Sequence, residues 1–209
     1  MIDARSLARR DHLIGAALCV AYVALLLATA PDLAMSRDES FYVHAAKSYA
    51  GWVQELLSDP ASALSQQSID RAWRYNWEHP AWMKLSFAWS WLAHEALGIF
   101  PRDSLAFRFP GMLSAGLLLW LIYAWGASVM PRRGAPFAAL AFASMPRVFY
   151  HSHLDCFDVP IALFTTLCAY VYWRALSDAR WVPVLGLTFG MALATKHNSW
   201  ILPGIFLIH

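Results

Sequence analysis

The stretch LIGAALCVAYVALLLATA, residues 13–30, holds no charged side chain over its 18 positions. A helix needs about 20 apolar residues to cross the hydrocarbon core of a bilayer. Arg5, Arg9 and Arg10 precede the stretch, so a cleaved signal peptide is the alternative. The apolar run exceeds the about 7–15 residues usual in a signal peptide, and no small-x-small cleavage site stands out beyond Ala28–Ala30. We therefore predict a first membrane helix that stays attached.

The composition of the whole chain extends this prediction to several membrane helices. Hydrophobic residues make up 59% of the 209 residues and charged residues 14%, where soluble domains carry about 25%. The mean hydropathy of +0.42 reflects more apolar surface than one soluble core of this size can bury. The apolar stretches predict an all-α, polytopic transmembrane bundle with helices at about 13–30, 109–130, 135–150, 159–176, 182–194 and 199–209.

The charge and the cysteines exclude other classes of protein. A net charge of +2, without a basic stripe, argues against a nucleic-acid partner. Cys19, Cys156 and Cys168 are odd in number and widely spaced, so we interpret them as small core residues rather than a disulfide framework. The last apolar stretch reaches only half a membrane helix before His209, so we expect the chain to be the N-terminal portion of a longer module.

The first two predicted spans are separated by residues 31–107, which begin with a polar stretch too long for a simple connection. Ser36-Arg37-Asp38-Glu39 fits a capping box, and apolar residues then recur at helical spacing to about Ser58. The resulting amphipathic helix suits a membrane surface. A second helix, Pro80–Gly98, is rich in tryptophan and phenylalanine and either spans the membrane or lies in its interface.

The basic residues decide between these two placements of Pro80–Gly98. If it lies in the interface, the N-terminal arginines, the pair Arg132 and Arg133, and the pair Arg174 and Arg180 all face the cytoplasm. If it spans, the last two clusters move outside. We therefore predict that residues 31–107 form one external loop with amphipathic juxtamembrane helices.

This topology brings many ionisable residues to one external face, which is typical of a functional site in an apolar chain. Asp38 with Glu39 offers a general base or a cation ligand, or else only caps its helix. Lys84 and Arg108 offer ligands for a phosphate, or else anchor helices at the interface. The whole set comprises Asp38, Glu39, Glu78, His79, Lys84, Arg108, His151, His153, Asp155, Asp158 and Lys196.

The segment His151–Asp158 places two histidines and two aspartates between two apolar stretches. Both residue types are metal ligands, which predicts a divalent metal on His151, His153 and Asp155. The alternative is a polar loop in which Asp158 caps the following helix before Pro160.

Taken in order, these motifs resemble those of membrane glycosyltransferases with the GT-C fold, namely protein O-mannosyltransferases and bacterial aminoarabinose transferases of lipid A. The likeness spans nearly the whole chain and rests on an ordered set of short motifs. These are Asp38-Glu39, His79-Pro80-Ala81 followed by Lys84, Arg108-Phe109-Pro110, Asp158-Val159-Pro160 twelve residues after Pro146, and Thr195-Lys196.

The resemblance implies a polyprenyl-phosphate-linked sugar as donor and inverting transfer to a protein, lipid or glycan at the external face of the bacterial inner (plasma) membrane. It implies Asp38 as catalytic base, Glu39 as a supporting carboxylate, and Asp158 as the acidic residue of the second external loop. Binding of the donor, chiefly its phosphate, would fall to His79, Lys84, Arg108 and Lys196.

The sequence also departs from the family pattern. Ala81 replaces a second proline, and His153 stands where an arginine is expected, beside the additional His151 and Asp155. These departures leave open the acceptor and a metal requirement. A transporter or flippase segment, or a membrane scaffold without catalysis, is the alternative function, because charges inside membrane proteins also line transport paths.

Overall fold

The computed structural model describes residues 7–131 and 133–209, and within these ranges the chain is helical without any β-strand. Arg5 and Arg132, two of the arginines used to predict topology, lie outside the described residues. The helices are α1 Arg9–Thr29, η1 Ala30–Asp32, α2 Arg37–Ser58, α3 Pro60–Ala63, α4 Gln66–Trp73, α5 Trp82–Leu97, α6 Asp103–Val129, α7 Gly134–Ser144, α8 Pro146–Ser152, α9 Asp158–Ala175, η2 Ala179–Trp181, α10 Val182–Thr195, η3 His197–Trp200 and α11 Ile201–Ile208.

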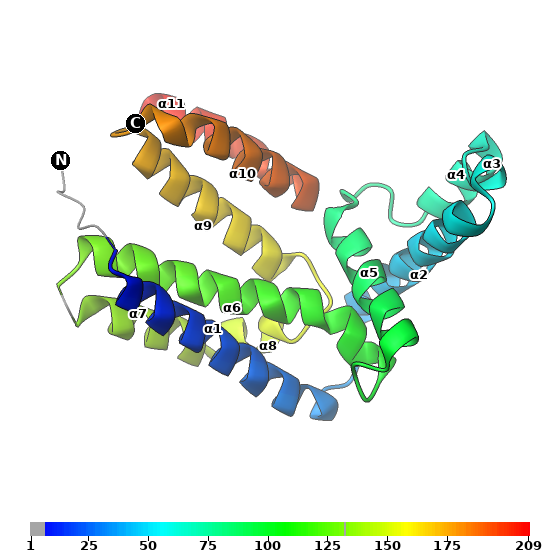
Figure 1. The fold of residues 1–209 in the computed structure, drawn as a ribbon, viewed down its shortest axis with the longest axis horizontal. Helices are drawn as coiled ribbons and strands as arrows, with labels where there is room; N and C mark the ends of the chain where they lie inside the picture. The colour runs from blue at the N-terminus through cyan, green and yellow to red at the C-terminus, as the bar shows by residue number, and fades with distance from the viewer. Residues whose placement is uncertain (1–6, 132) are drawn as a thin grey trace.

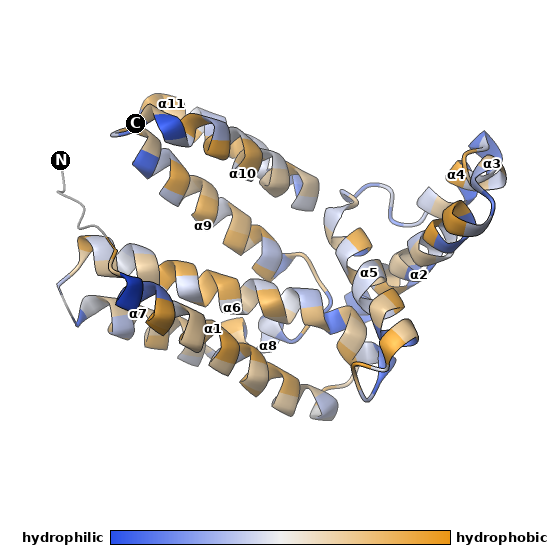
Figure 2. Cartoon of the chain, viewed as in Figure 1, coloured by the Kyte–Doolittle hydropathy of each residue, from blue (hydrophilic) through white to orange (hydrophobic). Residues whose placement is uncertain are grey.

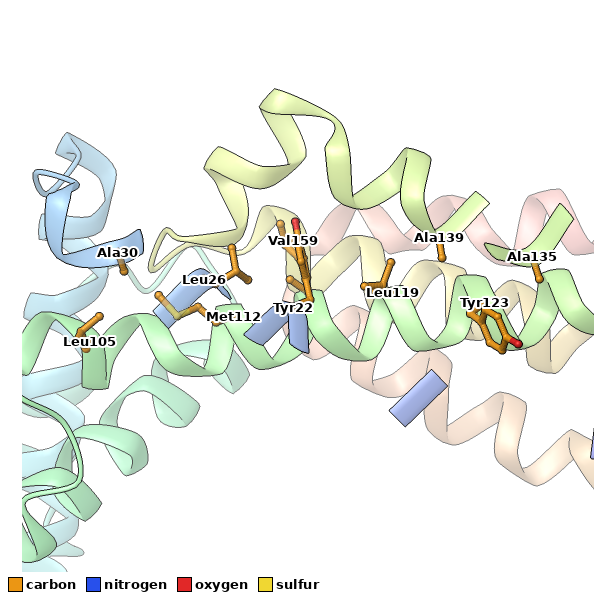
Figure 3. Packing of buried hydrophobic residues seen from close by; sticks show 11 residues of the cluster. Tyr22, Leu26, Ala30, Leu105, Met112, Leu119, Tyr123, Ala135, Ala139 and Val159 are labelled. Carbon is orange, nitrogen blue, oxygen red and sulfur yellow. The ribbon is translucent and has the colours of Figure 1, made fainter. Parts of the chain in front are cut away.

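Helix α6 forms the centre of the fold, with α1 and α7 packed along it. Figure 3 shows this core as a row of buried side chains, including Tyr22 and Leu26 of α1 and Met112 and Leu119 of α6. Close approach of the two helices depends on Gly116, because a Cβ there would lie 2.7 Å from Cγ2 of a valine on α1. Small residues allow this kind of backbone approach between apolar helices.

Two helices, α1 and α6, are long and apolar enough to cross a membrane by length and composition. Both are coloured mainly as hydrophobic in Figure 2, whereas hydrophilic colour gathers around α3 and α4. The predicted membrane span at about 109–130 lies within a longer helix, because α6 begins at Asp103. At 1.5 Å per residue its 27 residues span about 40 Å, more than the about 30 Å of a hydrocarbon core. Its first turns, with Arg108, can therefore extend beyond that core.

The predicted helix at 135–150 is two helices, α7 and α8, which break at Met145. Proline disfavours helical backbone at the residue before it, and Met145 precedes Pro146 with φ −68° and ψ 117°. The later helices α9, α10 and α11 agree with the predicted ranges to within about two residues.

Helices α2 and α5 pack on each other around buried residues such as Ala46, Tyr49 and Phe87. The predicted capping box is present, since the Ser36 backbone N–H donates to Glu39 Oε2 at 2.7 Å. Helix α5 begins at Trp82, two residues after the predicted Pro80, and ends before Gly98, whose φ of +63° is favourable for glycine.

Arginine residues at helix ends distinguish the two sides of the molecule. In Figure 1, α1 begins, α6 ends, α7 begins and α9 ends on the side where both termini lie, and α2 to α5 gather on the opposite side. The terminal side carries Arg9 and Arg10 at the start of α1, Arg133 at the N-cap of α7, and Arg174 and Arg180 at the end of α9 and in η2. The opposite side, beyond the start of α6, holds the candidate site.

Candidate functional site

A buried ion pair joins α6 to α2. Arg108, 2% exposed, donates from Nε to Glu39 Oε1 at 2.7 Å and from Nη2 to Oε2 at 3.0 Å. Its remaining donors meet the backbone carbonyls of Ala30, Leu33 and Ala34 at 3.0–3.4 Å. All five guanidinium N–H groups therefore have an acceptor. Binding of the phosphate of the sugar donor by Arg108 stays a prediction. In this arrangement every N–H group of the Arg108 guanidinium already has an acceptor within the protein.

Glu39 extends the ion pair to the loop between α8 and α9. Its Oε1 also accepts the backbone N–H of Asp155 at 3.0 Å, and its Oε2 accepts that of Ser36. Burial alone would raise the pKa of Glu39, but the hydrogen bonds from Arg108, Asp155 and Ser36 outweigh it and lower the pKa. Glu39 is thus an ionised, fully buried residue that connects α2 to α6 and to the loop between α8 and α9.

Asp155 is buried to 1% exposure, and neither of its carboxyl oxygens has a hydrogen-bond partner within the described residues. Burial raises the pKa of Asp155 well above its ordinary value, and the charge of Glu39 adds to the rise. Burial and Glu39 thus both disfavour the charged form of Asp155 beside the ion pair.

Lys84 is also fully buried and stabilises the loop before α5. Its Nζ donates to the backbone carbonyls of Asn76 and His79, the latter at 2.8 Å, and lies 5.4 Å from the ring centre of Tyr49. Burial lowers the pKa of Lys84 to about 8. The prediction that Lys84 binds a phosphate stays untested, while its observed contacts fix Asn76 in a left-handed conformation with φ +52°.

The accessible part of the site begins at Asp38, which is exposed in the first turn of α2. One turn later Tyr42 contacts Phe157, with ring centres 4.3 Å apart, and His79, at 6.2 Å. Burial, followed by the charge of Asp38, raises the pKa of Tyr42 to about 12. Burial and nearby lysines lower the pKa of His79, so its imidazole is neutral at pH 7. Tyr42 and Phe157 were not predicted, and their contacts depend on chain segments far apart in sequence.

Asp158 and Lys196 meet at the edge of this cluster. Lys196 Nζ donates to Asp158 Oδ1 at 3.0 Å, and both side chains are partly exposed. Asp158 stands in the first turn of α9, and Lys196 follows the last residue of α10. Two predicted site residues from separate motifs are therefore in direct contact and open to solvent.

The structure does not gather the predicted metal ligands His151, His153 and Asp155. His153 donates from Nδ1 to the Phe149 carbonyl at 2.7 Å, and its Nε2 lies 2.7 Å from Thr29 Oγ1. Asp155 faces the buried ion pair. Of the three, only His151 lies in a group of metal-ligand atoms, with Cys156 and Asp158.

An apolar groove of about 1250 Å³ adjoins this polar end, between α5, α6, α9, α10 and the C-terminal end of α1. Its wall includes Trp82, which follows His79 by three residues, and Phe164, which lies in the second turn of α9 after Asp158. Along α6 it extends from Leu105 to Leu121, about 24 Å of helix. A groove of this length suits an extended hydrocarbon chain.

Helices α1 and α6, which are long and apolar enough to span a bilayer, fit the class of integral membrane proteins. A family model, dolichyl-phosphate-mannose-protein mannosyltransferase, matches residues 79–208, and the chain belongs to this family. No curated protein and no solved structure matches the chain. The family points to a glycosyltransferase that uses a polyprenyl-phosphate-linked sugar, as the resemblance implied. The match includes Lys84, Arg108, Asp158 and Lys196 but begins after α2.

Proposed function

We propose that this chain forms part of a polytopic GT-C module that transfers a sugar from a polyprenyl-phosphate donor to an acceptor at the external membrane face. The observation that carries the proposal is the apolar groove beside the cluster of Asp38, Asp158 and Lys196. A lipid-linked sugar needs both environments at once, because its tail is apolar and its phosphate and sugar are polar.

The distribution of charge supports the external placement. Arg9, Arg10, Arg133, Arg174 and Arg180 stand at helix ends on the terminal side, opposite to the candidate site. Short basic segments favour the cytoplasmic side of a membrane. The site would then lie on the external face of the membrane, which in a bacterium is the inner membrane.

In the proposed reaction Asp38 acts as general base. Its carboxylate accepts the proton of the acceptor hydroxyl while the acceptor oxygen forms a bond to C1 of the sugar. The bond between C1 and the phosphate oxygen breaks, and its electron pair leaves with the phosphate. Lys196 can meet that developing charge because its ammonium is partly exposed and already anchored by Asp158.

The remaining predicted residues support this arrangement from different positions. His79, in the loop before α5, packs its neutral imidazole against the ring of Phe157. Glu39, Arg108 and Lys84 are buried, so we assign them the positioning of the two loops.

The test is transfer of radiolabelled sugar from polyprenyl-phosphate donors by the full-length protein in membranes. Asp38→Asn should slow transfer by ~100-fold or more at equal expression. Asp70→Asn is a matched control, because Asp70 is an exposed aspartate of the same loop whose side chain accepts a hydrogen bond from Gln66 and from no other described residue. Equal rates for Asp38→Asn and wild type would remove Asp38 as the base, and no transfer from any donor would overturn the proposed function.

A further inference from the structure

His151, Cys156 and Asp158 form a group of which the proposed sugar transfer uses only Asp158, through its contact with Lys196. One ligand atom from each lies within 4.8 Å of the other two. The three come from the end of α8, the following loop and the first turn of α9. Imidazole nitrogen, thiolate sulfur and carboxylate oxygen together form a donor set suited to Zn²⁺ and its neighbours in the first transition row.

The separation of His151 and Asp158 is compatible with two ligands of one metal ion. His151 Nδ1 is buried without a hydrogen bond, although Asp158 Oδ2 lies only 3.4 Å away. Zn–N and Zn–O bonds of about 2.0–2.2 Å at a tetrahedral angle place two ligand atoms roughly 3.3–3.5 Å apart. The observed separation of nitrogen and oxygen already falls in that range.

The surroundings orient two of the three ligands. Lys196 holds Asp158 Oδ1, which leaves Oδ2 directed to His151 as a single ligand atom. The backbone of Asp158 hydrogen-bonds the sulfur of Cys156, which is buried to 7% exposure. Partners of this kind fix ligand orientation in metal sites.

We propose that His151, Cys156 and Asp158 bind one transition-metal ion of the Zn²⁺ class, which fastens the loop between α8 and α9 to both helices. Binding replaces the proton of the Cys156 thiol with the metal ion and releases that proton to solvent. Three protein ligands leave the fourth position of a tetrahedral ion for water. The site goes beyond sugar transfer but shares Asp158 with it, and metal binding is measured without any assay of transfer.

The experiment titrates the full 209-residue chain, purified metal-free in detergent, with Co²⁺ as a spectroscopic probe. The expected result is one equivalent bound with a thiolate-to-cobalt charge-transfer band, which Zn²⁺ then displaces. Cys156→Ser should abolish the band, and Cys168→Ser, which changes another buried cysteine, should keep it. A wild-type chain without the band, or a band that persists in Cys156→Ser, would overturn the site.

Asp158→Asn provides a second variant, because this side chain is half-exposed and contributes little packing. It should weaken Co²⁺ binding by ~10-fold or more while the charge-transfer band remains at saturation. The group of His94, Glu95 and Asp103 contains no sulfur, so Co²⁺ bound there would give no such band. Unchanged affinity in Asp158→Asn would remove Asp158 from the ligand set and contradict the proposal.

Discussion

Replacing Arg108 by methionine tests the buried network that joins the loops of the site. Methionine preserves much of the side-chain length and removes the charge and all five donors. Glu39 would then keep only the backbone N–H groups of Ser36 and Asp155, while its carboxylate stays fully buried. The carbonyls of Ala30, Leu33 and Ala34 would lose their guanidinium donors at the same time.

The magnitude follows from the burial of both partners. Removing one member of a buried ion pair costs about 3–5 kcal/mol, because the other charge is left without compensation. The lost hydrogen bonds to three carbonyls belong to the same network and are not additive with this figure. We therefore expect Arg108→Met to lower the free energy of unfolding by about 4 kcal/mol.

The assay is unfolding of the purified chain in mixed micelles, followed by tryptophan fluorescence and circular dichroism. Arg71→Met is the matched control, since Arg71 pairs with Glu55 at 3.1 Å but is 69% exposed, and it should have a far smaller effect. The double variant Arg108→Met with Glu39→Leu should recover stability relative to the sum of the single changes. A loss below about 1 kcal/mol for Arg108→Met, or strict additivity in the double variant, would refute the reasoning.

Three further predictions follow from the packing, the lysine and the groove. The contribution of Lys84 to stability should rise from about pH 8 to 10, because its pKa is about 8 when folded and 10.5 ordinarily, so the unfolded chain binds more protons at Lys84 in that window. Stability of wild type relative to Lys84→Met should therefore rise with pH over this range, and a difference that does not change with pH would contradict this. Gly116→Ala should lower the melting temperature, whereas Gly190→Ala, with no atom within 4 Å of its new Cβ, should not, and equal effects would contradict close packing of α1 on α6. Leu113→Trp in the groove should raise KM for a polyprenyl-phosphate donor by ~10-fold at similar kcat. The control Leu140→Trp, at an exposed position on α7, should leave both constants unchanged. Equal KM in the two variants would contradict donor binding in the groove.

Local signals in the sequence predicted several features of this fold. The capping box at Ser36 and the glycine at Gly98 determine where α2 begins and α5 ends, because each acts through its own backbone neighbours. The break at Met145 has an equally local cause in Pro146, and the rule for the residue before proline would have found it. The apolar content on both sides concealed that signal.

The partners of the charged residues could not be predicted in this way. Arg108 and Glu39 are 69 residues apart in sequence, so nothing in either motif indicates their pairing. Lys84 is placed on α5 by its sequence, but its burial results from Tyr49 and from the carbonyls of a loop. Cys156 was predicted correctly as a buried residue, and its proximity to His151 depends on how α8 turns into α9.

In the proposed reaction, the buried network would hold Asp38 and Asp158 in place relative to acceptor and donor. Asp38 precedes Glu39 in the first turn of α2, and Asp158 follows Asp155, whose backbone N–H binds the same Glu39 carboxylate. One guanidinium, Arg108, therefore sets the positions of both acidic residues without contacting either one's exposed carboxylate. Loss of Asp38 should consequently lower kcat in a stably folded protein, whereas loss of Arg108 should disturb stability and both kinetic constants together. These different effects on kcat, KM and stability distinguish Asp38, which would accept the proton, from Arg108, which would only position Asp38.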